Sequence, residues 1–319
     1  MRLPFDKPTR TWLKRIGLAV WLVAVAALVF LQVRDLEWPK VLEALRSFGP
    51  ARIAAGAAFV LPACAAVAFF DLIGRNATGH GLPVPRVMLI SFTGYFFSLN
   101  LGALVGGLAF RYRLYMPYRL PPVTISQVIG LSVVTNWSGY VLIAGAVLLF
   151  QPPELPPDWG LGPGLLRGTG ALLLAAAAAY LVLCAIRGGD CIRWKGSAFE
   201  LPTLGIAALQ IGLSVLSWAS IGAVIAALLP GEASWLAVMP VLMISALAGI
   251  WSHVPGGLGV IEAVFLALLD TSAPAGEVVA AILVYRLLYY VAPFALAIAA
   301  YAFLETGGRP PPRRSGKVA

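Results

Sequence analysis

The chain has 319 residues, of which 60% are hydrophobic and 12% are charged, and its mean hydropathy is +0.87. A water-soluble fold needs more polar surface than this composition supplies, so we expect the folded part to lie in a membrane. The net charge of +9 does not indicate a nucleic-acid partner, because the basic residues flank the apolar blocks. Three cysteines and two histidines, without ligand spacing, predict no disulfide framework, metal site or cofactor.

Six apolar stretches have the length of a complete membrane-spanning helix, about twenty residues each. The first, 16–33, follows a basic segment and ends without a small-residue cleavage site, so we predict a retained signal anchor. The amphipathic stretch 38–48 should then lie flat at the membrane surface. The remaining predicted spans are 51–73, 125–150, 165–186, 203–229 and 277–304.

Two further apolar stretches, 87–110 and 235–269, are interrupted near the middle by glycine and proline. Both residues weaken a continuous helix, so we predict that each stretch forms a hairpin of two half-helices that enters and leaves the membrane on the same face. The predicted hinge residues are Gly106, Gly107, Pro255, Gly256, Gly257 and Gly259.

The distribution of lysine and arginine among the loops places both termini in the cytoplasm. Loop 34–50 does not fit this arrangement, because it is placed outside although it contains basic residues. The first hairpin then enters from the cytoplasmic face and the second from the opposite face. The predicted fold is an all-α transmembrane bundle of about six full spans and two opposed re-entrant hairpins. It forms one domain, 1–308, with inverted half-repeats at 12–150 and 160–305, followed by a disordered basic tail, 309–319. Transporters typically have this architecture.

Three motifs carry a resemblance to a known family. They are Gly106-Gly107 followed by Arg111, the run Val-Pro-Gly-Gly-Leu-Gly-Val-Ile-Glu at 254–262, and Tyr-Arg-Leu-Leu-Tyr-Tyr at 285–290. In these motifs the chain resembles the membrane domain of lysylphosphatidylglycerol synthases and related stand-alone flippase-like proteins. The resemblance implies lipid transport or trafficking in the cell inner membrane. Because the chain ends shortly after its last predicted span, we expect the soluble aminoacyltransferase domain of the large members to be absent.

Two charged residues are the main candidates for the chemistry of the membrane interior. Glu262 should lie in the opening turns of a half-helix, where the helix dipole favours a carboxylate. It could bind a cationic headgroup, exchange a proton, or form a fixed ion pair. Arg286 should lie roughly 15 Å deep, at about 1.5 Å per residue of helix. It suits a lipid phosphate, while the alternative is a pair with Glu262.

Further candidates surround these two. The resemblance favours Arg111 for substrate binding, whereas Arg113 fits a cytoplasmic anchor. His253 could change its charge near neutral pH or remain a neutral hydrogen-bonded group. Asn100 and Asn136 could line the same site or join helices by hydrogen bonds. Tyr290 should follow Arg286 by one turn on the same helical face, and the lesser candidates are Asp71 and Gln210.

Three functions remain open at this stage. The first is a flippase or carrier for an amphipathic lipid, such as an anionic phospholipid or an isoprenoid-linked lipid, without enzymatic activity. The second is a non-catalytic subunit of an envelope-lipid synthesis complex, which requires a lipid-synthesis enzyme as partner. The third is an intramembrane headgroup transferase with Glu262 or His253 as its base.

Overall fold

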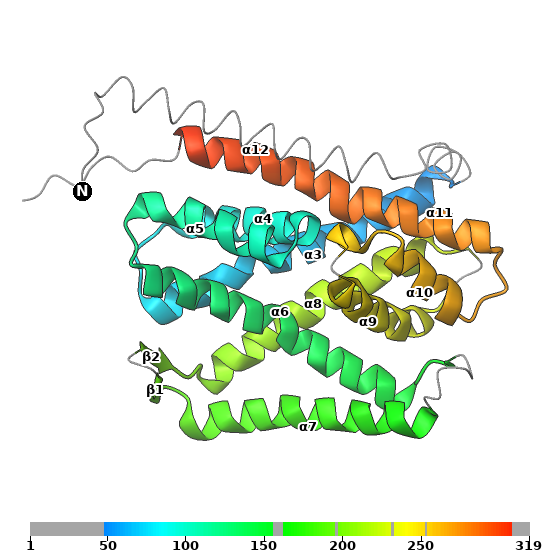
Figure 1. Cartoon of the computed structure of the whole chain (residues 1–319), viewed down its shortest axis with the longest axis horizontal. Coiled ribbons are helices and arrows are strands. Elements are labelled where there is room, and N and C mark those ends of the chain that lie inside the picture. The colour runs from blue at the N-terminus through cyan, green and yellow to red at the C-terminus, as the bar shows by residue number, and fades with distance from the viewer. Residues whose placement is uncertain (1–47, 156–161, 195–196, 231–232, 253, 308–319) are drawn as a thin grey trace, which may run out of the picture.

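A computed structural model describes residues 48–155, 162–194, 197–230, 233–252 and 254–307. The described chain is helical except for one two-stranded ribbon, so the predicted all-α class is confirmed (Figure 1). The elements are α3 (Pro50–Thr78), α4 (Val84–Leu101), the π-helix η1 (Ala103–Ala109), α5 (Phe110–Tyr115), η2 (Met116–Tyr118), α6 (Pro122–Phe150), α7 (Pro163–Arg187), β1 (Cys191–Trp194), β2 (Ser197–Glu200), α8 (Leu204–Leu228), α9 (Trp235–Trp251), η4 (Pro255–Gly257), α10 (Val260–Leu268), α11 (Ala275–Arg286), the π-helix η5 (Leu287–Val291) and α12 (Ala292–Gly307).

Five of the predicted spans appear as helices long and apolar enough to cross a membrane. Helices α3, α6 and α7 each begin on a proline, whose fixed φ and missing N–H suit the first turn of a helix. The last span runs continuously from Ala275 to Thr306 through α11, η5 and α12. The predicted span 16–33 and nearly all of the predicted surface helix 38–48 lie outside the described residues.

The first hairpin, predicted over 87–110, spans residues 84–115 in the structure, with α4 as the entering arm and η1 and α5 as the returning arm. The chain reverses at Gly102, whose φ of 88° lies in the region that favours glycine. Gly106 has helical backbone and lies against the other arm, where an added Cβ would collide with the carbonyl group of Phe97. The predicted hinge glycines of this hairpin therefore form the contact between its arms, while Gly102 makes the turn.

The second predicted hairpin, residues 235–268, pairs α9 with α10. Between them the chain turns through η4, and Gly256 and Gly257 both have left-handed backbone, with φ of 63° and 60°. Gly259, with φ of 77°, then precedes the first turn of α10. The turn therefore falls at the predicted hinge from Pro255 to Gly259.

The two hairpins enter the bundle from opposite ends. Figure 1 shows the base of the first at the left and the base of the second at the right, with their turns directed toward the middle. Element η4 of the second hairpin contacts α4 of the first. In each half a long helix, a hairpin and another long helix follow in that order, and the first long helices of the two halves, α3 and α8, pack along each other. Helix α4 of the first half packs on α12 of the second half, and α9 of the second half packs on α6 of the first. An inverted repeat produces this exchange of partners between its halves.

The two ends of the bundle differ in charge. At the end where α3, α7 and α12 finish lie the arginines Arg75, Arg86, Arg113, Arg119 and Arg187; we call this the basic end. The base of the first hairpin belongs to the basic end, and the base of the second belongs to the opposite end.

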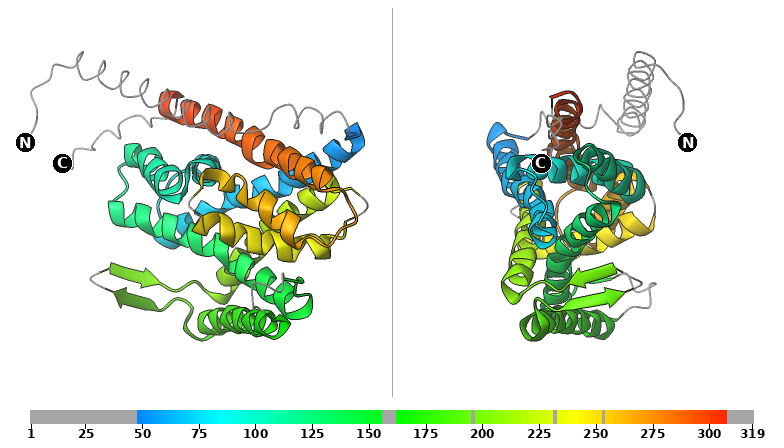
Figure 2. Two further views of the ribbon diagram at one scale, coloured as in Figure 1. Left: turned by 45° about the vertical axis from the view of Figure 1, so that its right-hand side comes forward. Right: turned by 90° about the vertical axis from the view of Figure 1, so that its left-hand side faces the viewer.

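Helix α7 and the β1–β2 ribbon form the outermost layer on one side, as both views of Figure 2 show. Few side chains of α7 are buried, and it packs on α6 and α8. A chain of hydrogen bonds joins these helices: Tyr180 donates to Gln210 over 2.6 Å, and Gln210 donates to Thr135 over 3.1 Å. Gln210, a lesser site candidate, therefore connects helices.

Candidate functional site

Arg286 lies at the end of α11 and is only 2% exposed. Its Nε and Nη2 donate to the two carboxylate oxygens of Glu262, over 2.5 and 3.0 Å. Its Nη1 donates to the carbonyl of Gly256 and its Nη2 to that of Gly257, both over 2.7 Å. A single guanidinium thus holds α10 and the turn of the second hairpin against α11. Among the interpretations left open for Glu262 and Arg286, this geometry corresponds to the ion pair between them.

The backbone around this pair follows from its sequence. Glu262 lies in the first turn of α10, where the positive end of the helix dipole stabilises a carboxylate. After Arg286 the helix widens into the π-helix η5, and Pro293 follows it without an N–H to offer to the carbonyl of Tyr289. The guanidinium carbon of Arg286 lies 5.5 Å from the centroid of the Tyr290 ring, so Tyr290 is on the predicted face.

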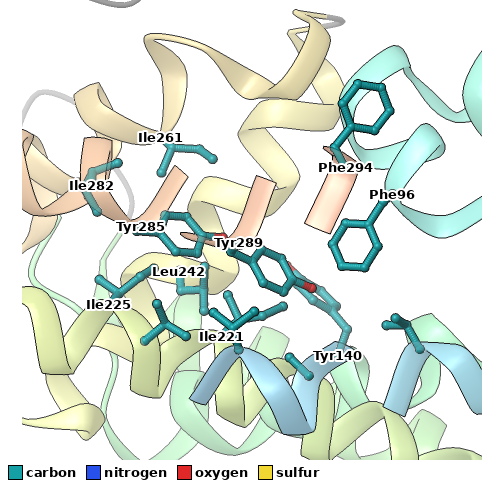
Figure 3. Close-up of a cluster of buried hydrophobic side chains, with 14 of the residues drawn as sticks. Phe96, Tyr140, Ile221, Ile225, Leu242, Ile261, Ile282, Tyr285, Tyr289 and Phe294 are labelled. Carbon is teal, nitrogen blue, oxygen red and sulfur yellow. The ribbon is translucent and has the colours of Figure 1, made fainter. Parts of the chain in front are cut away.

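Aromatic rings connect this pair to the first hairpin. Tyr285 and Tyr289 are stacked, with ring centroids 5.8 Å apart, and Phe96 of α4 meets Tyr289 edge-on at 5.8 Å (Figure 3). The hydroxyls of Tyr95 and Tyr289 lie 3.2 Å apart. The last span, through α11 and η5, therefore shares one buried aromatic core with α4 of the first hairpin, and Ile261 of α10 also packs into this cluster.

A second buried ion pair lies between the first hairpin and α3. Arg111 of α5 is 5% exposed, and its Nη1 lies 3.3 Å from Asp71 Oδ1 and donates to Ser132 Oγ of α6 over 2.9 Å. Tyr115 donates its hydroxyl proton to Asp71 Oδ2 over 2.8 Å. Gly94 lies directly beside the Arg111 side chain, which an added Cβ would strike. The first hairpin is thus built with room for this arginine.

The two arginines differ in how much of their hydrogen-bonding capacity is used. All three nitrogens of Arg286 have partners, whereas Nε of Arg111 is buried and has no partner among the described residues. Asp71 Oδ1 also lacks a hydrogen bond within the described chain, and its contact with Arg111 Nη1 at 3.3 Å is an ionic one. A buried arginine with unused donors can accept a further anion, while Arg286 would first have to release the hairpin turn.

Asp71, a lesser candidate in the sequence, is fully buried and contacts Arg111 and Tyr115. A carboxylate inside an apolar span needs a cationic partner, and that rule could have directed attention to it. Ser91 of α4 supports the site by donating to the carbonyl of Val67 over 2.7 Å and accepting from the Asp71 N–H over 3.3 Å. No sequence pattern distinguishes the residues that bond to this pair, which are Ser132, Tyr115 and Ser91.

The remaining candidates are dispersed. Asn100 is buried at the inner end of α4, where its Nδ2 donates to the carbonyl of Phe96 over 2.9 Å. Asn136 lies on α6, and its backbone carbonyl accepts bonds from Ser214 and Trp218 of α8, so it takes part in helix packing. Arg113 pairs with Glu305 of α12 over 2.8 Å at the basic end. His253 lies outside the described residues.

Comparison with known proteins identifies the class of membrane protein that this architecture represents. The family described as lysylphosphatidylglycerol synthase TM region matches residues 16–297, and the chain belongs to this family. It is therefore a membrane protein of that family. Inner membrane protein YbhN of Escherichia coli (strain K12) is 36% identical over 298 residues, which cover 92% of this chain and 94% of that protein. An uncharacterized protein of Synechocystis sp., slr0712, is 28% identical over 299 residues, 91% of each chain.

Proposed function

We propose that this protein is an inner-membrane carrier that moves an amphipathic lipid with a negatively charged phosphate headgroup between the leaflets. The basic end would face the cytoplasm, with both termini on that side, because loops rich in arginine stay in the cytoplasm. The full-length similarity to a protein named as an inner membrane protein supports the location.

The observation that carries the proposal is the buried Arg111, held by one ionic contact of 3.3 Å and one serine, with Nε unused within the described chain. Arginine recognises phosphate through several N–H groups at once. A headgroup that replaced Asp71 as the partner of Arg111 would be bound at the return arm of the first hairpin. Arg286 and Glu262 would meanwhile keep the second hairpin folded.

Irregular backbone at membrane depth supports the same proposal. Lipid tails cannot satisfy the peptide groups of such turns, and here the protein does so: the carbonyl of Gly102 accepts from the Gly106 N–H, and those of Gly256 and Gly257 accept from Arg286. Opposed hairpins of this kind define the substrate region in many transporters. The transferase alternative is less well supported for Glu262, because both of its carboxylate oxygens already accept bonds from Arg286; His253, the other candidate base, lies outside the described residues.

The test is translocation of headgroup-labelled phosphatidylglycerol in vesicles that contain the purified full chain. We expect the wild-type protein to move the labelled lipid, chemically unchanged, between leaflets. The variant Arg111→Gln should be slower by about ten- to a hundredfold, because a charge-assisted hydrogen bond contributes about 1.5–3 kcal/mol.

A matched control is Arg187→Gln, which removes an exposed arginine from the end of α7 and should leave the rate unchanged. Equal rates for wild type and Arg111→Gln would contradict the assignment of Arg111. A wild-type rate no greater than that of empty vesicles, for both phosphatidylglycerol and a polyprenyl phosphate, would contradict the carrier. Turnover of the headgroup would instead indicate a transferase.

A further inference from the structure

Three buried polar groups beside α3 lack hydrogen bonds that buried groups normally make. Within the described chain these are Oδ1 of Asp71, Nε of Arg111 and both ring nitrogens of His80. Their residues are 0%, 5% and 8% exposed, respectively. Buried polar atoms without partners are rare in folded proteins, and they gather where a group must change its partner or its protonation. Four of the seven such side-chain atoms in the described chain belong to these three residues, and the others belong to Thr93, Asn136 and Ser217. The ionisable members therefore point to a function beyond packing.

His80 connects this region to the basic end. It lies in the loop between α3 and α4, and its ring centroid is 6.2 Å from that of Tyr115. The hydroxyl of the same Tyr115 donates to Asp71. Burial, followed by the nearby charge of Arg75, lowers the pKa of His80 below its usual value, so its ring is neutral at neutral pH. A neutral imidazole can take a proton at one nitrogen and release one from the other.

The net charge of the ion pair determines whether a bound anion needs a compensating positive charge. Arg111 and Asp71 together are neutral, so a lipid phosphate that enters beside them adds a net negative charge to a buried site. An uncompensated buried charge costs several kcal/mol. Protonation of Asp71 removes that cost, since the carboxylic acid is neutral and Arg111 then balances the phosphate alone.

We propose that the carrier is coupled to protons: one proton moves onto Asp71 Oδ1 for each negative charge of the lipid phosphate that binds Arg111. The inference rests on the proposed function, and it identifies the coupling ion. On binding, the ionic contact between Arg111 and Asp71 breaks and that between Arg111 and the phosphate forms. The proton comes from water at the basic end by way of His80, and it leaves when the phosphate leaves. Proton and lipid therefore travel in the same direction.

The groups that face Asp71 agree with this assignment. Helix α5 presents Arg111 and Tyr115 to the carboxylate, Ser91 of α4 accepts from the Asp71 backbone N–H, and Ser132 of α6 accepts from Arg111. His80, in the loop after α3, is close enough for the charge of Asp71 to act on it. Arg75, one turn further along α3, acts on His80. Among these described groups Arg111 is the cation in contact with Asp71, so transfer of Arg111 to a phosphate leaves the carboxylate without its charge partner.

The test measures proton uptake when the full chain binds a lipid in weakly buffered detergent solution with a pH indicator. The probes are phosphatidylglycerol, a polyprenyl phosphate and, as a comparison, inorganic phosphate; binding is measured in parallel by intrinsic fluorescence. With a phospholipid of single negative charge, we expect the wild type to take up about one proton per bound lipid. Asp71→Asn should bind the lipid without proton uptake. Glu154→Gln, which alters an exposed carboxylate, should behave as the wild type.

The outcomes separate this inference from the proposed function. Binding by the wild type without proton uptake, or equal uptake by Asp71→Asn, would overturn the coupling and leave the carrier intact. A wild type that binds none of the lipids would overturn the Arg111 site and the coupling with it. Should Asp71→Asn fail to fold, the infrared difference spectrum of the wild type decides. A new carboxylic-acid carbonyl band on lipid binding supports the inference, and its absence contradicts it.

Discussion

Replacing Arg286 with glutamine is expected to lower the free energy of unfolding by about 3–5 kcal/mol, the usual cost of removing one partner from a buried ion pair. The change would leave the Glu262 carboxylate buried without a cation, and the carbonyls of Gly256 and Gly257 without their donors. Thermal unfolding of the purified protein in detergent measures the effect. The expected result is a clear fall in the unfolding midpoint, with little protein recovered from the membrane.

A double variant separates the ion pair from the two carbonyl contacts. With Glu262→Gln added to Arg286→Gln, no buried carboxylate remains unpaired, so stability should recover in part. It should not recover fully, because the carbonyls of the turn still lack the Arg286 donors. An Arg286→Gln protein that unfolds at the wild-type midpoint would show that this pair does not hold the second hairpin.

Replacing Gly106 with valine is expected to prevent the first hairpin from closing. The Cβ alone would collide with the backbone carbonyl of Phe97 in the facing arm, and backbone cannot move aside as a flexible side chain can. Overpacking of this kind costs typically about 1–3 kcal/mol, and here the two arms would also separate. The expected results are a lowered unfolding midpoint and loss of lipid movement, because Arg111 lies five residues further along the displaced arm.

The matched control for this variant is Gly130→Ala in α6. Gly130 also has helical backbone, but an added Cβ there meets no atom within 4 Å. Alanine favours a helix over glycine by about 1 kcal/mol, so this control should be as stable as the wild type or slightly more stable. If Gly106→Val and Gly130→Ala unfolded at the same temperature, the close contact between the hairpin arms would be wrong.

Much of the fold could be predicted from apolar runs and their interruptions. A run of about twenty apolar residues has few alternatives to a spanning helix, and the five described spans follow that rule. The hairpins were predictable because glycine and proline interrupt the apolar stretches 87–110 and 235–269. The short β1–β2 ribbon was not predicted, since its eight residues lie in a loop without an apolar pattern.

The exact position of a turn depends on backbone conformation, which composition does not specify. In the first hairpin three glycines lie within six residues, and only Gly102 adopts the left-handed conformation. Gly106 and Gly107 cannot be told apart from Gly102 in the sequence, but in the structure they allow close contact with residues 97–98. In the second hairpin the proline restricts where the chain can turn, and the predicted hinge coincides with the observed turn.

The pairing of the buried charges was the least predictable part of the site. The sequence presented Glu262 with Arg286 as one pair among several possibilities, and the structure places four hydrogen bonds on that arginine. The partnership of Arg111 with Asp71 joins residues forty positions apart on different helices, so no local pattern reveals it. Unused donors such as Arg111 Nε depend on tertiary packing, which no single-sequence pattern reports.

The account rests on two hairpins that enter the membrane from opposite faces, and cysteine labelling tests this most directly. In a chain whose native cysteines are replaced by alanine, Gly81→Cys marks the base of the first hairpin and Ser272→Cys marks the base of the second. With a membrane-impermeant maleimide, we predict that Gly81→Cys is labelled only from the cytoplasmic side and Ser272→Cys only from the other side. Labelling of both cysteines from the same side would contradict the account.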